Sequence, residues 1–253
     1  VESGWDVKHT MKLIVMSRAY RQSSVSSDEM RERDPYNRLY ARQSRYRLPA
    51  EMVRDNALAV SGLLVEKVGG ASVKPYQPEG YYRHLNFPTR RYAEHKDDRQ
   101  WRRGLYVHWQ RQFLHPMLKA LDAPSREECT AQRPRSNTPL AALTLLNDPT
   151  FVEAARAFAA RIISEGGETD DERFQFAFAH AVSRSPDEVE DGILRTLLAT
   201  QRAHYRQHPE EAKKLIAIGL APMPSDDLDT AELAAWTAVA RVILNMNEAI
   251  SRN

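Results

Sequence analysis

Two helix starts in the middle of the chain constrain its fold more than any other feature. Asn137 or Thr138 can cap a helix that begins at Pro139, and Asp148 can cap a second helix that begins at Pro149. Proline suits the first helical position because its missing N–H would have no partner there. The second helix carries one apolar stripe at a period of 3.6 residues, formed by Phe151, Ala155, Phe158, Ala159 and Ile162.

The charged residues of this second helix fall outside the apolar stripe. Glu153 and Arg156 are three residues apart, a spacing that places them side by side on one helix face. Because they lie on the other side from the stripe, they are predicted to form a weakly stabilising pair on the surface.

Further helix starts follow toward the C-terminal end. Residues 169–172 and residues 185–188 each have the sequence of a capping box, with Pro186 at the first helical position in the second case. A shorter helix is expected over residues 210–218, and Asp229 is expected to cap a final apolar helix.

The first seventy residues also have helical patterns. Asp6 is predicted to cap a first helix, whose apolar face consists of Val7, Met11, Ile14 and Val15. A short helix is expected to begin at Pro35 and a longer one at Pro49. Gly62 or the glycine pair at 69–70 could end the longer helix.

Between residues 71 and 137 the helical period fades. Prolines at positions 75, 78, 88, 116 and 124 interrupt regular structure, and aromatic residues are frequent. Residues 101–113 fit either a helix or an extended strand, and the helix is favoured slightly. A segment of this composition typically wraps over a helical core, although it can instead line a ligand groove.

These patterns predict a mainly α-helical protein, with a bundle-like helical domain and an irregular central segment rich in proline and aromatic residues. Residues 1–253 are expected to form a single domain that lacks its N-terminal part. Within it, residues 1–70 are expected to be helical, residues 71–137 to form an irregular aromatic and arginine-rich segment, and residues 138–253 to be helical again.

Charge and cysteine content argue against several classes of function. Lys and Arg number 36 and Asp and Glu 34, which leaves a formal net charge of +2 and no basic footprint for nucleic acid. The one cysteine, Cys129, cannot form an internal disulfide, and the residues after it do not complete the C-x-x-C-H motif that attaches haem. No apolar run reaches the ~20 residues of a membrane helix, and no signal peptide is visible.

Glu51 and Asp55 are four residues apart on the helix expected to begin at Pro49, so both carboxylates project from the same face. Such a pair can perform acid–base chemistry or hold a divalent cation. The favoured interpretation is a structural network with arginines, in which Arg126 of the polar loop 122–137 binds Glu51 or Asp55. The full candidate cluster is Glu51, Arg54, Asp55, Trp109, Asp122, Arg126, Cys129, Arg133, Arg135 and Asn137.

Cysteine and histidine offer weaker alternatives. Cys129 could act as a nucleophile if His108 or His115 lay beside it, but a small buried or half-buried thiol is the favoured interpretation. His204 and His208 have the i,i+4 spacing of two metal ligands on one helix face. Because no third ligand is evident, no metal site is expected.

Several long motifs, in order along nearly the whole chain, carry a family resemblance. They include GWDVKHTMKLIVMSRAYRQSS near the start, RYRLPAEMVRDNALAVSGLLVEKVGG, RRGLYVHWQRQFLHP, DAPSREEC followed by NTPLAALTLLNDPTFVEAAR, and ELAAWTAVARVILNMNEAISRN at the end. The chain resembles the C-terminal PSD-type domain of unknown function found downstream of planctomycete cytochrome c domains.

This resemblance implies a large, exported, multidomain bacterial parent protein that carries haem c in other domains. It implies that the chain is a C-terminal fragment and that its location is extracytoplasmic, either periplasmic or at the cell surface. The family has no established activity, so the resemblance implies no mechanism.

The expected function is therefore that of a non-catalytic interaction or accessory module. It would pack against the missing upstream part of the same polypeptide or against a partner protein, and self-association could follow. The alternative is a hydrolase that acts on an extracellular polymer with the central carboxylates as acid and base. No cofactor, nucleic acid or membrane span is expected in this chain.

Overall fold

The computed structural model describes residues 4–85, 89–111, 113–223 and 228–252. The contacts divide the chain into two compact units, one of residues Val1–Leu48 with Ser251–Asn253 and one of residues Pro49–Ile250. The protein is mainly α-helical, as the sequence predicts. Whether residues 1–253 form a single domain stays a prediction.

The first unit consists of two helices and a short strand pair. Helix α1 spans Val7–Met16, and the Asp6 side chain accepts the N–H of His9 at its start, which confirms the predicted helix and cap. Helix α2 spans Asp28–Arg33. Strand β1, Tyr46–Arg47, pairs antiparallel with strand β2, Ser251–Arg252, which brings the last described residues of the chain into this unit.

The prediction of a helix that begins at Pro35 is wrong, because the chain forms a turn there instead. The buried carboxylate of Asp34 accepts the backbone N–H groups of Arg38 and Leu39, at 2.9 and 2.8 Å. Those two bonds close a compact turn and occupy the side chain that would have capped a helix.

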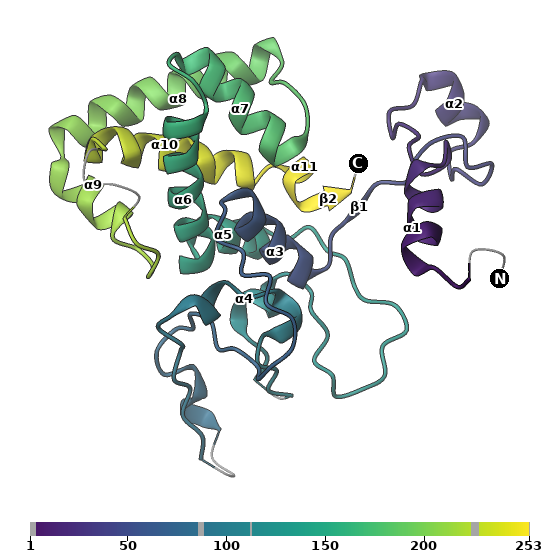
Figure 1. The fold of residues 1–253 in the computed structure, drawn as a ribbon, viewed down its shortest axis with the longest axis horizontal. Coiled ribbons are helices and arrows are strands. Elements are labelled where there is room, and N and C mark those ends of the chain that lie inside the picture. The colour runs from purple at the N-terminus through teal and green to yellow at the C-terminus, as the bar shows by residue number, and fades with distance from the viewer. Residues whose placement is uncertain (1–3, 86–88, 112, 224–227, 253) are drawn as a thin grey trace. The chain divides into compact units, whose positions relative to one another are not determined.

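The second unit is built around helix α6, Pro149–Glu165, which packs most extensively against α10, Thr230–Leu244 (Figure 1). Further neighbours are α3, Ala50–Val60, α5, Pro139–Asn147, and α7, Asp170–Val182. The predicted stripe of α6 is buried along its whole length. The largest buried side chains of the core include Phe158, Phe174, Phe178 and Trp236.

Three further helices complete the C-terminal half: α8, Glu188–Gln207, α9, Pro209–Ile216, and α11, Asn247–Ile250. The predicted capping box at Thr169 is confirmed, and so are the predicted caps at Asp148 and Asp229. The predicted box at residues 185–188 is wrong by two residues. Asp187 caps α8 instead, because its side chain and that of Glu190 each accept the other's backbone N–H.

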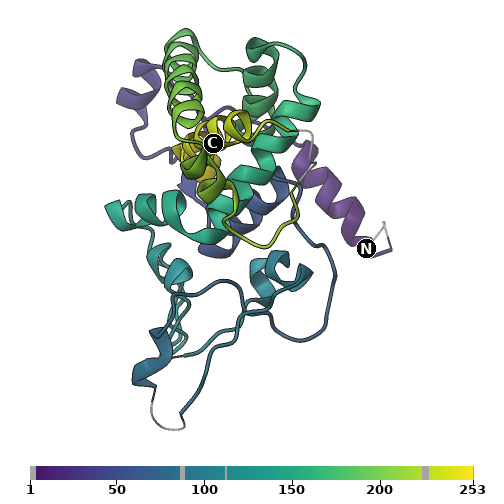
Figure 2. The same ribbon diagram turned by 90° about the vertical axis from the view of Figure 1, so that its left-hand side faces the viewer.

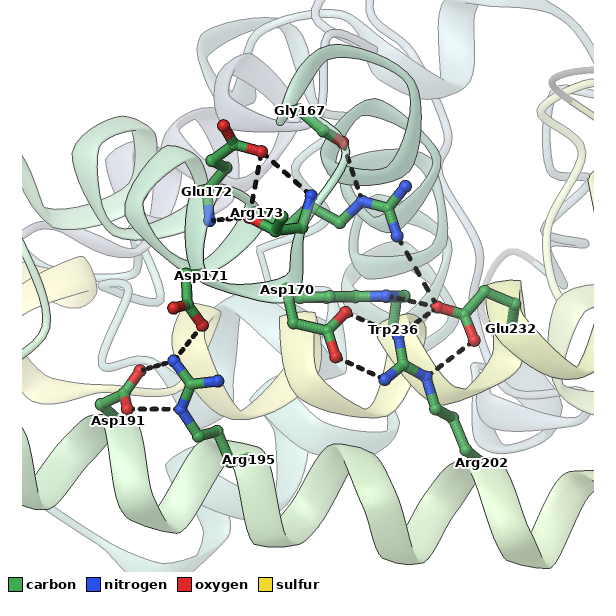
Figure 3. A network of polar contacts seen from close by, with 11 residues as sticks. Gly167, Asp170, Asp171, Glu172, Arg173, Asp191, Arg195, Arg202, Glu232 and Trp236 are labelled. Carbon is green, nitrogen blue, oxygen red and sulfur yellow. Dashed lines mark hydrogen bonds and ion pairs between the residues drawn. The ribbon is translucent and has the colours of Figure 1, made fainter.

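An ion network ties α7, α8 and α10 together (Figure 3). Arg202 of α8 donates to both carboxylate oxygens of Asp170 on α7, at 2.6 and 2.7 Å, and to both oxygens of Glu232 on α10. Glu232 also accepts the indole N–H of Trp236 at 2.8 Å. Because Arg202 bridges two carboxylates in a bidentate manner, it defines how the three helices face one another.

The described parts of residues 71–137 lie beside the helical core of the second unit (Figure 2). They contain short 3-10 turns, Tyr81–His84, Asp98–Trp101 and Gly104–Tyr106, and the short helix α4, Pro116–Ala120. The favoured helix over residues 101–113 is therefore wrong. Val107 instead pairs with Val73 in an isolated parallel bridge.

Gly104 explains how closely this segment approaches α3. A Cβ atom at this position would lie 2.8 Å from the Cβ of Glu51 and 2.9 Å from its backbone oxygen. Only glycine permits that approach. Within the described residues, no helix combines the length and the apolar character needed to cross a bilayer.

Candidate functional site

The predicted cluster at α3 forms, but with a different arginine. Glu51, in the first turn of α3, accepts two hydrogen bonds from Nη1 of Arg133, at 2.8 and 3.0 Å. The predicted bond from Arg126 is wrong, because Arg126 lies with its guanidinium 3.9 Å from the centre of the Trp109 ring. Glu51 is therefore paired with a loop arginine, as expected, although the partner is seven positions further on.

Hydrogen bonds between the two ends of the loop hold this arrangement in place. The Asp122 carboxylate accepts the backbone N–H and the hydroxyl of Ser136, at 2.7 and 2.8 Å. Because these bonds join the two ends of the loop, residue 133 reaches α3 while residue 126 turns toward Trp109. Arg126 has a φ of +62°, a left-handed conformation that turns the chain at this point.

Arg54 and Asp55 form the buried part of the cluster. The Arg54 side chain is completely buried and donates to the backbone oxygens of Arg102, at 2.6 Å, and of Gln100. Asp55 accepts the N–H of Gly104 at 2.6 Å and lies 3.8 Å from Arg54. Burial raises the pKa of Asp55, while the Gly104 N–H and the Arg54 charge act against that rise. The pair attaches the irregular segment to α3.

Three further predicted candidates lie at the surface. Cys129, Arg135 and Asn137 are exposed. Thr138, and not Asn137, caps α5 by accepting the N–H of Ala141. His115, a base that Cys129 would need, is buried elsewhere and bonded to the backbone oxygen of Tyr76.

The most completely buried carboxylate in the second unit is one that sequence reasoning placed on the surface. Glu153 of α6 is 0% exposed. It accepts hydrogen bonds from the Tyr76 hydroxyl at 3.0 Å and the Trp101 indole N–H at 2.9 Å, and from the backbone N–H groups of Leu220 and Ala221, both at 2.5 Å. Four donors from three separate segments thus converge on one side chain.

The backbone at Gly219 and the side chain of Arg156 pack closely against Glu153. Gly219 has a φ of +96°, and a Cβ there would lie 2.4 Å from the Glu153 carboxyl carbon. Glycine is therefore needed to present the two following N–H groups to the carboxylate. Arg156 lies 4.0 Å from Glu153 and donates to the backbone oxygen of Ala221 at 2.6 Å. The predicted surface pair is wrong, because both residues are buried.

Tyr76 connects this carboxylate with His115. Burial, followed by the neighbouring Glu153, raises the pKa of the Tyr76 hydroxyl well above its usual range. The Tyr76 backbone oxygen lies 2.6 Å from Nε2 of His115. Because a carbonyl oxygen can only accept, the His115 proton is on Nε2. Burial lowers the pKa of His115 to about 4, so its ring is neutral at neutral pH.

A pocket of about 730 Å³ opens beside Tyr76, between α4 and α5. Its walls are mainly apolar and include Tyr81, Met117, Leu140 and Leu143. Glu94 and Lys119 are among its few charged residues. Such a composition suits a small apolar molecule or an apolar side chain. The central segment therefore covers the helical core and also lines this pocket.

The histidine pair at 204 and 208 is engaged in local contacts. The two rings stack with centroids 4.5 Å apart, and Nε2 of His204 lies 2.8 Å from a carboxylate oxygen of Glu211. Throughout the described residues, no three His, Cys, Asp or Glu side chains form a group that could hold a metal ion.

The first unit has an apolar surface on α1. Val7, Met11 and Ile14, which share one face of the helix, are 69%, 60% and 55% exposed. No residue of α1 is buried. Three neighbouring exposed apolar side chains on a preformed helix make a candidate interaction surface.

The family model PSD1, described as a protein of unknown function (DUF1553), matches residues 1–198. The chain belongs to the PSD1 family. No curated protein and no solved structure matches it. The PSD1 match covers residues 1–48 of the first unit and continues to Leu198 in α8, so it includes Glu153, Tyr76 and Trp101. The Leu220 and Ala221 N–H donors lie beyond it.

Two signals could have placed Glu153 in the core of this PSD1 protein. The α6 sequence around it, VEAARAFAA, is small and apolar on all sides, which is typical of a helix buried all round. The glycine at 219 ends a predicted helix and precedes two residues whose N–H groups are free to bind. Neither signal identifies the partner, because the contact joins residues more than sixty positions apart.

Proposed function

We propose that this PSD1-family protein is a non-catalytic interaction module whose helix α1 docks onto a protein surface that is apolar and carries carboxylates. The observation that carries this proposal is the exposure of the α1 face formed by Val7, Met11 and Ile14. We define these three residues as the α1 stripe.

Helix α1 is formed without the help of packing. The Asp6 side chain caps its start, and the backbone N–H and hydroxyl of Ser17 bond to the Ile14 oxygen at its end. Each apolar side chain of the stripe gains about 1.5–3 kcal/mol when it is fully buried. A partner that covers the stripe would therefore supply the tertiary packing that this helix of ten residues, with none of them buried, does not have on its own.

The charges beside the stripe indicate the chemistry of the partner. Lys8 and Lys12 lie on α1, and the first turn of the helix contains no acidic residue. A second copy of α1 would bring like charges together, which disfavours self-association through this face. A surface with carboxylates next to apolar side chains would complement both features.

The central carboxylates support an interaction role over the alternative of a hydrolase. A hydrolase needs a carboxyl group free to exchange a proton with its substrate. Glu51, Asp55, Asp122 and Glu153 are each held by the donors described above. Their arrangement is that of structural anchors, and no contact among them favours the hydrolase.

We further propose that the partner is the preceding part of the same polypeptide, in an exported, multidomain, cytochrome-bearing bacterial protein. The sequence resemblance supports this proposal, and with it an extracytoplasmic location and haem carried in other domains. Covalent linkage would raise the effective concentration of the partner to the millimolar range, so a small docking face would suffice.

A hydrophobic dye tests whether the stripe is accessible in solution. We expect the protein to bind 1-anilinonaphthalene-8-sulfonate, and the double variant Met11→Ser/Ile14→Ser to lose about half of the fluorescence because much accessible apolar surface has gone. Met16→Ser is the matched control, since Met16 is 59% exposed but lies outside the stripe. Equal fluorescence of the double variant and the control would contradict the proposal.

A further inference from the structure

A second pocket lies in the first unit, away from the α1 stripe. It has a volume of about 520 Å³ and is lined by the turns around residues 24–26 and 35–45. Three arginines line it, Arg31, Arg42 and Arg45, together with the hydroxyls of Ser24 and Ser26. No carboxylate is among its lining residues. Three guanidinium groups in one small pocket repel one another unless an anion compensates them.

Arg42 is held firmly in the wall of this pocket. Its Nη2 donates to the backbone oxygens of Asp34 and Pro35, at 3.0 and 3.1 Å, and its own backbone oxygen accepts from the Asn37 side chain. Its Nη1 atom is buried and has no hydrogen-bond partner among the described residues. A buried guanidinium nitrogen without a partner is uncommon, and because it is closed to solvent, Arg42 acts on a ligand in the pocket through its charge and not through this atom.

The other two arginines are oriented by serines. Nε of Arg31 donates to the Ser26 hydroxyl at 2.9 Å, and Nε of Arg45 donates to the Ser24 hydroxyl at 3.0 Å. Because each serine occupies only the Nε position and Nη1 of Arg31 donates to Asp28, Nη2 of Arg31 and the terminal nitrogens of Arg45 stay available to a ligand. Arg31 also contacts Asp28 at 3.2 Å, but that carboxylate is 93% exposed and screened by water.

The nearby Asp34 compensates only part of this charge. Its carboxylate accepts the N–H groups of Leu39 and Arg38, which together with the charge of Arg42 lower its pKa, and it is not among the lining residues. Three positive charges thus face the pocket, with the charge of Asp34 acting on Arg42 and the exposed Asp28 beside Arg31. The field inside is positive, and the available donors have the planar geometry that suits oxyanions.

We propose that this pocket binds a small ligand through an oxyanion group, namely a phosphate, a sulfate or a carboxylate. The pocket is larger than a single inorganic anion, so it has room for the organic body that carries the group. Val25, Pro35 and Tyr36 provide apolar contacts for that body. This proposal does not depend on the docking of α1, because no residue of α1 lines the pocket.

A titration of the whole chain tests the proposal. Sodium phosphate, sodium sulfate and sodium acetate are added separately at constant ionic strength, and the Nε–H signals of the arginines are followed by NMR. We expect saturable shifts for Arg31, Arg42 and Arg45 with at least one of the three anions. The anion that binds most tightly identifies the oxyanion class.

Three glutamine variants test the pocket. Arg31→Gln and Arg45→Gln change residues that line it, and Arg33→Gln is the control. Arg31→Gln and Arg45→Gln should each weaken binding about tenfold, the effect of losing one charge-assisted contact. Arg33→Gln removes the same charge from the same helix as Arg31 but does not line the pocket, so its affinity should be unchanged. If Arg45→Gln loses its circular dichroism, Arg45→Lys replaces it and should weaken binding less.

The proposal is overturned if none of the three anions gives saturable shifts. It is also overturned if Arg33→Gln weakens binding as much as Arg31→Gln, because the effect would then reflect overall charge rather than the pocket.

Discussion

Replacement of Glu153 by alanine is expected to lower the free energy of unfolding of the second unit by about 3–5 kcal/mol. The change removes an acceptor that is fully buried and that four donors share. The Tyr76 hydroxyl, the Trp101 indole N–H and the Ala221 N–H would lose this acceptor, whereas the Leu220 N–H would keep the Tyr76 hydroxyl oxygen at 2.8 Å. Each unpaired buried group costs about 1–3 kcal/mol. Urea unfolding followed by far-UV circular dichroism measures the loss.

Two variants sharpen this test. Glu165→Ala lies on the same helix and breaks an exposed pair with Arg161, so it should cost less than about 1 kcal/mol. Glu153→Gln keeps the shape and one of the two acceptor oxygens, so its loss should fall between the two. If Glu153 instead belonged to a catalytic site held under strain, its removal would leave stability unchanged or raise it.

Acidification between pH 6.5 and pH 4 is expected to destabilise the second unit through His115, by up to about 3 kcal/mol. Burial lowers the folded pKa of His115 to about 4, whereas an unfolded histidine titrates near 6.5. Between these values the unfolded chain binds a proton that the folded chain does not, so stability falls as the pH falls. Above pH 6.5 both states are neutral and the contribution is fully present.

The variant His115→Gln isolates this effect. Glutamine can keep a donor toward the Tyr76 oxygen but does not titrate, so its free energy of unfolding should change less between pH 6.5 and pH 4. Other groups, including His95 and His108 with their lowered pKa values, contribute equally to both proteins and cancel in the comparison. Parallel stability curves for the two proteins would show that His115 is not the group responsible.

The helices and most of their ends could be predicted because their causes are local. Asp6, Asp148, Thr169 and Asp229 each accept an N–H within three residues, and a short stretch of sequence contains both partners. The α8 start shows the limit of this argument. Ser185 and Asp187 both precede a glutamate at the capping-box spacing, and the pattern cannot choose between them.

The central cluster could be predicted only in kind. The sequence predicts that an arginine of the polar loop pairs with Glu51. The pair does form, but its arginine is Arg133 and not Arg126. The choice depends on how the loop closes through Asp122 and Ser136, which no periodicity reveals. The donors to Glu153 could not be predicted, because they come from Tyr76, Trp101 and the turn after α9, and only the folded chain brings them together.

The most direct measurement is the binding of this chain to the segment that we propose precedes it in the polypeptide, expressed separately and followed by sedimentation velocity. We predict a one-to-one complex that is lost in Met11→Ser/Ile14→Ser and kept in Met16→Ser. Vesicles of phosphatidylcholine with phosphatidylserine are examined in parallel, because a helix with lysines beside an apolar face can also bind an anionic membrane. Absence of the complex, or binding of the stripe to vesicles alone, would contradict the account.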